Sequence, residues 1–221
     1  MLRVSIIGPG NVKYHYQDML KLPKGKFSKE LKDIAKALVK ANSEIVVLPD
    51  DGAPFELACL YKKFGGQKAF ASIPKDDKDL GIEHLKPYAE YKINGKRLFD
   101  EVINTKDWYG ETFYLAMLGD VVLMLGFSLG SMGELSLSYY MHKVFIGDKV
   151  MKGVKDKRVP PQIRGGKSVP FSVIIYKPFI KHRLNKEMEL YIRRHKGRIY
   201  YAENGNDIFN VLKQLESIKS G

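Results

Sequence analysis

Short apolar runs alternate with amphipathic segments along most of the chain. The runs are rich in Val and Ile and predict strands at 2–8, 44–49, 68–74, 120–126, 143–147, 172–178 and 198–202. Between them, apolar residues recur at helical spacing in 28–42, 54–66, 109–118, 131–141, 182–196 and 206–218. Buried strands that alternate with helices are typical of a mostly parallel sheet with helices on both faces. We therefore predict one Rossmann-like α/β domain over residues 1–221.

Some helix boundaries carry their own signals. Ser28 followed by Glu30 predicts a serine cap at the start of the first helix. Pro54 is typical of a first helical turn, and the pair Gly65-Gly66 is typical of a helix end.

Two segments interrupt the alternation. Residues 75–105 are charged and irregular, which predicts an insertion with a small hairpin turned at Asn94-Gly95. Residues 149–170 are basic and contain a Pro-Pro and a Gly-Gly pair, which together predict a loop.

Composition narrows the class of protein. The chain has 221 residues with 44% hydrophobic and 28% charged residues, as in ordinary globular proteins. No apolar run approaches the roughly 20 residues that a membrane span needs, and the N-terminus predicts a strand rather than a signal peptide. Cys59 is the single cysteine, which excludes an internal disulfide and fits a reducing compartment. We expect a cytoplasmic protein without membrane association.

The formal charge of +12 favours anionic partners without choosing among nucleotides, nucleic acids and anionic surfaces. Positive charge is concentrated at 149–167, where Asp156 is the only acid. This segment has two interpretations that remain open: a solvated connector, or a loop that contacts phosphate or nucleic acid.

Three predicted strands end in small or glycine-bearing turns, at 8–11, 49–53 and 126–131. In open parallel sheets ligands bind beyond the carboxyl ends of the strands, and helix N-termini there attract anions. We predict a phosphate-bearing ligand in contact with Gly8, Pro9, Gly10, Asn11, Asp51, Gly52, Ala53, Ser128, Leu129, Gly130 and Ser131. Neither a G-x-G-x-x-G fingerprint nor a P-loop motif occurs in the sequence.

Two glutamates are candidates for chemistry. Glu134 follows the third turn and opens a predicted helix, where a carboxylate can bind ribose hydroxyls, stabilise an oxocarbenium-like centre or position water. Its alternative role is that of an acid that only favours the helix dipole. Glu111 is the candidate second acid if catalysis occurs, and its alternative role is that of a capping or solvated acid.

The remaining polar candidates are also open to two interpretations. Asp50 and Asp51 can bind Mg²⁺ or ribose hydroxyls, or Asp51 can be an N-cap or turn residue before the helix that follows. His15 lies between Tyr14 and Tyr16, and either stacks or transfers a proton at the site or packs within the loop. The five histidines and one cysteine show no metal spacing, so we predict neither a metal site nor a cofactor.

The segment DVVLMLGFSLGSMGELSLSYY (120–140) resembles the signature of the LOG family, which is often labelled lysine-decarboxylase-like and belongs to a superfamily that includes DprA. That signature is a strand followed by P-G-G-x-G-T-x-x-E. Gly130 matches the third glycine, Ser131 the threonine and Glu134 the glutamate. The register of strand, glycine turn, helix and strand at 44–74 is also similar, and the resemblance covers residues 1–147.

The resemblance implies a Rossmann-like fold and a homo-oligomer, typically a dimer formed by helices that flank the site. Enzymes of the family cleave the N-glycosidic bond of a nucleoside monophosphate, using an arginine whose place falls at or near Glu111 here. The leading hypothesis is a LOG-like nucleoside phosphate-binding protein, with phosphoribohydrolase-like cleavage as its candidate activity. The alternative is a non-enzymatic ligand sensor or nucleic-acid-associated module that uses 149–167.

Overall fold

The computed structural model describes residues 1–145, 160, 163 and 169–220. The basic residues Lys149, Lys152, Lys155, Lys157, Arg158, Arg164 and Lys167 lie outside this part of the chain. A nucleic-acid contact through 149–167 therefore stays a prediction.

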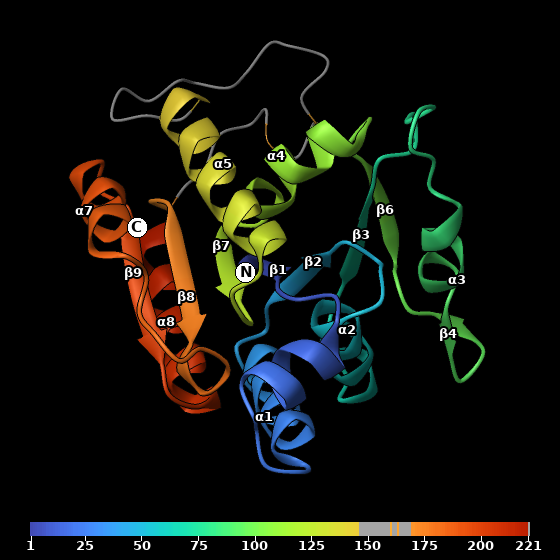
Figure 1. Cartoon of the computed structure of the whole chain (residues 1–221), viewed down its shortest axis with the longest axis horizontal. Helices are drawn as coiled ribbons and strands as arrows, with labels where there is room; N and C mark the ends of the chain where they lie inside the picture. Colours follow the sequence, from blue (N-terminus) through green and yellow to red (C-terminus); the bar gives the residue numbers. More distant parts are fainter. Residues whose placement is uncertain (146–159, 161–162, 164–168, 221) are drawn as a thin grey trace.

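A seven-stranded parallel sheet forms the centre of the molecule, with the strand order β6-β3-β2-β1-β7-β8-β9 (Figure 1). Its strands are β1 (Arg3–Ile7), β2 (Glu44–Val47), β3 (Ala69–Ile73), β6 (Glu101–Asn104), β7 (Val121–Met124), β8 (Ser172–Tyr176) and β9 (Arg198–Ala202). The predicted Rossmann-like α/β architecture is confirmed.

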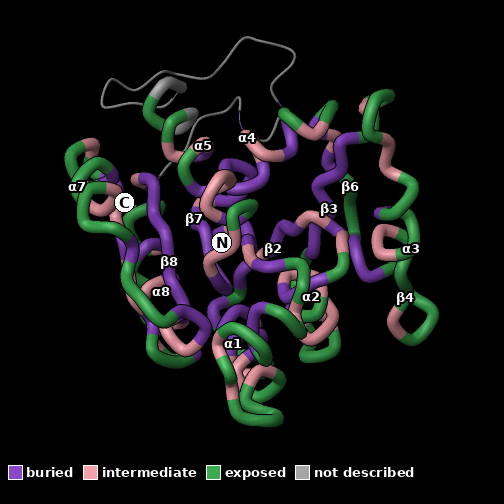
Figure 2. The backbone as a smooth tube through the Cα atoms, viewed as in Figure 1, coloured by how far each residue is buried: buried purple, intermediate pink, exposed green. Residues whose placement is uncertain are grey.

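Helices cover both faces of this sheet because successive strand residues point in opposite directions. On β1, Val4 and Ile6 enter one hydrophobic core and Ile7 enters the other. The first core is closed by α1 (Lys26–Lys40), α2 (Ala53–Lys63) and α8 (Gly205–Ser220). The second core is closed by α4 (Trp108–Leu118), α5 (Leu129–Phe145) and α7 (Lys186–Arg194). The central strands are accordingly the most continuously buried part of the chain (Figure 2).

Shorter elements complete the fold. They are the π-helical segment η1 (Lys13–Met19), the 3₁₀ turns η2 (Glu83–Leu85) and η3 (Lys177–Phe179), the single turn α3 (Lys86–Ala89), and the strands β4 (Lys92–Ile93) and β5 (Lys96–Arg97). The last two pair antiparallel around Asn94-Gly95, so the predicted hairpin is confirmed. Within the described part of the chain, no helix combines the length and the apolar character needed to cross a membrane.

The predicted strand at 143–147 is wrong. Residues 143–145 form the end of α5, and residues 146–147 lie outside the described part of the chain. A short apolar run does not distinguish a strand from a helix by periodicity alone, and here the run continues the preceding helix.

Two further local predictions need correction. The irregular stretch 75–105 contains β6, a strand that pairs with β3 at the edge of the sheet. Its Glu101 and Val102 are exposed, so it lacks the apolar pattern of a buried strand. The serine cap at Ser28 is also wrong, because α1 begins at Lys26 after Gly25, which adopts φ +79° in the preceding turn.

The connection order creates a crevice in the sheet. From β1 the chain builds outward through β2, β3 and β6, and it then returns to place β7 on the other side of β1. The helices that follow β1 and β7 therefore lie on opposite faces of the sheet. Their divergence leaves a crevice at the carboxyl ends of these two strands.

Candidate functional site

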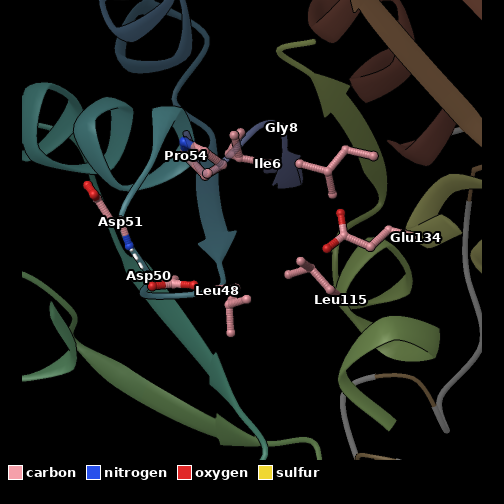
Figure 3. Close-up of a pocket in the computed structure, with 10 residues that line it drawn as sticks. Ile6, Gly8, Leu48, Asp50, Asp51, Pro54, Leu115 and Glu134 are labelled. Atoms are coloured by element: carbon pink, nitrogen blue, oxygen red, sulfur yellow. Dashed lines mark hydrogen bonds between the residues drawn. The ribbon is translucent and has the colours of Figure 1, made fainter. Parts of the chain in front are cut away.

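An open cavity of about 100 Å³ lies at this edge of the sheet, beyond the carboxyl ends of β1 and β2 (Figure 3). The residues that line it are Ile6, Ile7, Gly8, Gly10, Leu48, Asp50, Asp51, Pro54, Leu115 and Glu134. The pocket thus joins the turn after β1, the turn after β2, and the helices α4 and α5.

The three glycine-bearing turns pack directly against one another. Gly52 adopts φ +142°, and a Cβ there would lie 2.6 Å from the Cα of Gly10 and 2.8 Å from the carbonyl oxygen of Pro9. A Cβ at Gly126 would lie 2.9 Å from the ring of Pro9. Only residues without a side chain allow the three turns to meet around Pro9. The structure therefore brings together the segments that the sequence analysis placed at one edge.

Glu134 extends from α5 on one side of the pocket, opposite Asp50 at the end of β2 (Figure 3). No side chain or amide of the described residues donates a hydrogen bond to Glu134. Its carboxyl oxygens can therefore accept hydrogen bonds from a group in the pocket. Burial raises the pKa of Glu134 from its ordinary 4.5 to about 7, and the charge of Glu111 acts in the same direction. A carboxyl group with this pKa changes its charge near neutral pH.

Glu111 lies behind the pocket wall and is only 2% exposed. Its carboxyl oxygens are 2.7 Å from the Ser72 hydroxyl and 2.5 Å from the Thr105 hydroxyl. Burial raises the pKa of Glu111 to about 7, and hydrogen bonds from the two hydroxyls limit the rise. The interpretation of Glu111 as a capping or solvated acid is wrong: Asp107 caps α4 by accepting from the Gly110 amide at 2.6 Å.

The hydrogen bonds around Glu111 indicate whether the protein interior favours its neutral or its ionised form. The Ser72 hydroxyl lies 2.7 Å from Glu111 and also 3.2 Å from the carbonyl oxygen of Val47. A hydroxyl has one proton, so it cannot donate to both. When Glu111 is protonated, it donates to Ser72, and Ser72 then donates to Val47. The neutral acid thus satisfies all three groups.

The start of α5 is already capped by its own serines. The Ser128 hydroxyl accepts from the Ser131 amide at 3.1 Å, and the Ser131 hydroxyl accepts from the Ser128 amide at 2.8 Å. The next amides available to an anion are those of Leu129 and Gly130, which have no partner within a helix at these positions. Both residues are exposed, Leu129 at 95%.

The turn after β1 is also ordered by its own side chains. The Asn11 side chain accepts from the Tyr14 amide at 2.9 Å, and Lys13 follows in the next segment, η1. His15 is 4% exposed and packs edge-on against Tyr16 with ring centroids 4.7 Å apart. Its Nε2 has no hydrogen-bond partner among the described residues, and burial lowers its pKa. This geometry supports the packing interpretation of His15.

The turn after β2 carries two neighbouring acids. Asp50 accepts a hydrogen bond from the Asp51 amide at 2.7 Å. The helix α2 has Gly52 as its N-cap without a side-chain hydrogen bond, so Asp51 is not the cap; it lies in the turn before this helix, as the other part of that interpretation expects. Ala53 instead donates its amide to the Pro9 carbonyl at 3.2 Å, which ties this turn to the turn after β1.

The pocket is acidic although the chain is strongly basic. Asp50, Asp51 and Glu134 are its polar side chains, and no Lys, Arg or His occurs among the described residues that line it. Burial and then the charge of Asp51 raise the pKa of nearby Glu56. The three lining acids could be found in the sequence, since they follow predicted strands. Ser72 and Thr105, which hold Glu111, could not, because no sequence signal joins β3 and the end of β6 to α4.

No protein-family model matches the sequence, and a search of curated proteins found no match. Solved structures do match. A molybdenum cofactor binding protein from Rippkaea orientalis has 13% identity and a TM-score of 0.58, with 97% of this chain and 96% of that chain covered. The molybdenum cofactor carrier protein of Chlamydomonas reinhardtii has 13% identity and a TM-score of 0.56, with 97% and 98% covered. The chain shares the Rossmann-like fold of these proteins over nearly its whole length.

Proposed function

We propose that the protein binds a nucleoside phosphate, or a similar phosphate-bearing heterocycle, at the pocket beyond the carboxyl ends of β1 and β2, opposite Glu134 of α5. The observation that carries this proposal is the pocket at the carboxyl ends of the parallel strands, next to the reversal of strand order, where Glu134 has a carboxyl group with no hydrogen-bond donor among the described residues. Ligands of open α/β sheets bind at such a reversal. The proteins of similar fold are described as binding or carrying a cofactor, which supports binding by this fold as well.

The size of the pocket indicates how the ligand lies. Pockets that enclose a whole small molecule measure roughly 300–1,000 Å³, whereas this pocket measures about 100 Å³. It therefore receives one end of the ligand. The phosphate lies outside, over exposed Gly10 and the amides of Leu129 and Gly130 at the start of α5, which have no acceptor among the described residues.

Hydrolysis of the N-glycosidic bond is a second candidate, favoured by one observation. Glu134 faces the pocket with a pKa of about 7, so both its protonated and its ionised forms are populated at neutral pH. An acid in this state can position a water or stabilise positive charge on the sugar. Binding does not depend on this second step.

The proposal is tested by titrating the protein with the 5′-monophosphates of adenosine, guanosine, cytidine and uridine, using calorimetry, while free base is followed by chromatography. A change of Leu129→Glu introduces a negative charge at the exposed start of α5, where an acid does not harm the helix. We expect it to weaken binding about fivefold or more through repulsion of the phosphate. The matched control is Leu190→Glu, on exposed α7, which should have no effect. Absence of binding by all four nucleotides would contradict the proposal.

A further inference from the structure

We infer that the pocket selects ligand ends that donate hydrogen bonds or carry positive charge, such as the amino edge of a heterocycle, and excludes phosphate and carboxylate groups. The inference rests on the proposed function and assigns the orientation of the ligand: nitrogen-bearing end inside, phosphate outside. In this orientation Glu134 accepts from the amino edge of the heterocycle, so the orientation is an alternative to the hydrolysis candidate, in which Glu134 contacts the sugar.

The wall of the pocket is acidic. Its acidic lining residues are Asp50, Asp51 and Glu134, of which Asp50 and Glu134 lie on opposite sides of the pocket while the carboxyl group of Asp51 points away from it (Figure 3). An ionised carboxylate only accepts hydrogen bonds. The negative charges of Asp50 and Glu134 would repel a phosphate in the pocket, whereas an amino or amidine group would meet acceptors.

Among the described residues, no cation lies behind the pocket wall to compensate the charge of Glu134 and Glu111. Glu111 and the wall residue Leu115 are four positions apart on α4, so they lie on the same face of the helix. The described partners of Glu111 are the hydroxyls of Ser72 and Thr105, and no described Lys or Arg forms an ion pair with it or with Glu134. The described part of the chain therefore leaves the place of a donor or cation beside Glu134 to the ligand.

The pocket is small and partly apolar. The volume of about 100 Å³ corresponds to about three water molecules in the liquid. Ile6, Leu48 and Leu115 form the apolar part of the wall. A small flat group with an amino nitrogen at its edge matches both the volume and the mixture of apolar and acidic walls.

The experiment compares ligands that differ by one amino group. Guanosine 5′-monophosphate is paired with inosine 5′-monophosphate, and adenosine 5′-monophosphate with purine riboside 5′-monophosphate. Dissociation constants are measured at pH 8 for the wild-type protein, Glu134→Gln and the exposed control Glu90→Gln. In at least one pair we expect the amino-bearing member to bind the wild type about tenfold tighter, because a hydrogen bond to a charged acceptor is lost in its partner.

In Glu134→Gln the preference within that pair should fall to about twofold or less while the amino-free member still binds, and Glu90→Gln should behave as the wild type. If the nucleotides bind but both pairs bind equally, the inference is overturned and the proposed function stands. A preference that persists in Glu134→Gln overturns the assignment to Glu134. If none of the four ligands binds, the proposed function fails and the inference fails with it.

Discussion

At the scale of single residues, the feature that distinguishes this site is a pair of carboxyl groups with raised pKa values. Glu111 is enclosed by the protein and Glu134 faces the pocket, and the charge of the first raises the pKa of the second. Two acids coupled in this way lose their protons in two steps, and the pKa of each step is a property of the pair rather than of one residue. Each of the two raised pKa values has a measurable consequence, one for stability and one for ligand binding.

The pKa of Glu111 governs stability. Because this pKa is about 7 in the folded protein and 4.5 ordinarily, the folded state holds a proton that the unfolded state has lost between these values. The stability that protonated Glu111 contributes is therefore full below pH 4.5 and is lost as pH rises from 4.5 through 7. Compared with Glu111→Gln, the wild type should lose roughly 2–3 kcal/mol of unfolding free energy between pH 5 and 8. Urea denaturation across this range measures the difference.

Glutamine is a close mimic of the neutral acid, so Glu111→Gln should fold and its stability should depend less on pH. The control Glu90→Gln changes an exposed acid and should follow the wild type. Parallel curves for wild type and Glu111→Gln would contradict the raised pKa of Glu111.

The pKa of Glu134 governs proton exchange on binding. A ligand that donates to Glu134 stabilises the ionised carboxylate and lowers its pKa in the complex. Binding of guanosine 5′-monophosphate at pH 6.5 should therefore release protons from the wild type and fewer from Glu134→Gln. Calorimetry in two buffers of different ionisation enthalpy measures the number released. Proton uptake on binding would show that the ligand accepts from a protonated Glu134 instead.

At the scale of secondary-structure elements, the site depends on direct contact between the turn after β1 and the turn after β2. The turn after β2 can approach the turn after β1 only because Gly52 has no side chain, and the amide of Ala53 then bonds to Pro9. This contact sets the position of Asp50 and Asp51 in the pocket, so a change in the backbone here affects ligand binding as well as stability.

Gly52→Ala tests this contact, with Gly65→Ala as its control. Gly65 also has a positive φ of +85°, but a methyl group there would meet nothing within 4 Å. Gly65→Ala should cost about 1–2 kcal/mol from the left-handed backbone alone. Gly52→Ala should cost about 1–3 kcal/mol more, because a methyl group overlaps the backbone of Gly10. Equal losses in denaturation midpoint and equal nucleotide binding would show that the turns separate without strain.

At the scale of the whole molecule, the order of the strands decides where a ligand binds. The sequence places basic residues at 149–167, while the described fold places the pocket beyond the carboxyl ends of β1 and β2, with Glu134 of α5 on its opposite wall. Hydrogen exchange distinguishes the two. A saturating nucleoside monophosphate should slow exchange at 8–11, 50–53 and 126–131 and leave the β9 edge at 198–204 unchanged. Protection confined to 149–167 would favour the nucleic-acid-associated alternative.

Much of the fold could be predicted because burial on both faces gives strands such as β1, β2 and β7 continuous apolar runs. The failures have physical reasons as well. The edge strand β6 is exposed and polar, and the apolar residues of 143–145 belong to a helix that packs on α4. Helix starts were less predictable than helix interiors, because a glycine turn rather than a serine cap begins α1.

The order of residues along the chain is sufficient to identify those that follow the strands: the glycines of three turns, Asp50, Asp51 and Glu134, since strand ends can be recognised from local periodicity. The assembled fold was needed to show that Glu111 stands behind the pocket wall, held by Ser72 and Thr105 from two other segments. The acidic pocket of this basic protein likewise became visible only in three dimensions. The burial of a residue and the charges around it depend on which helices and strands pack together there. A local pattern of residues does not determine that packing.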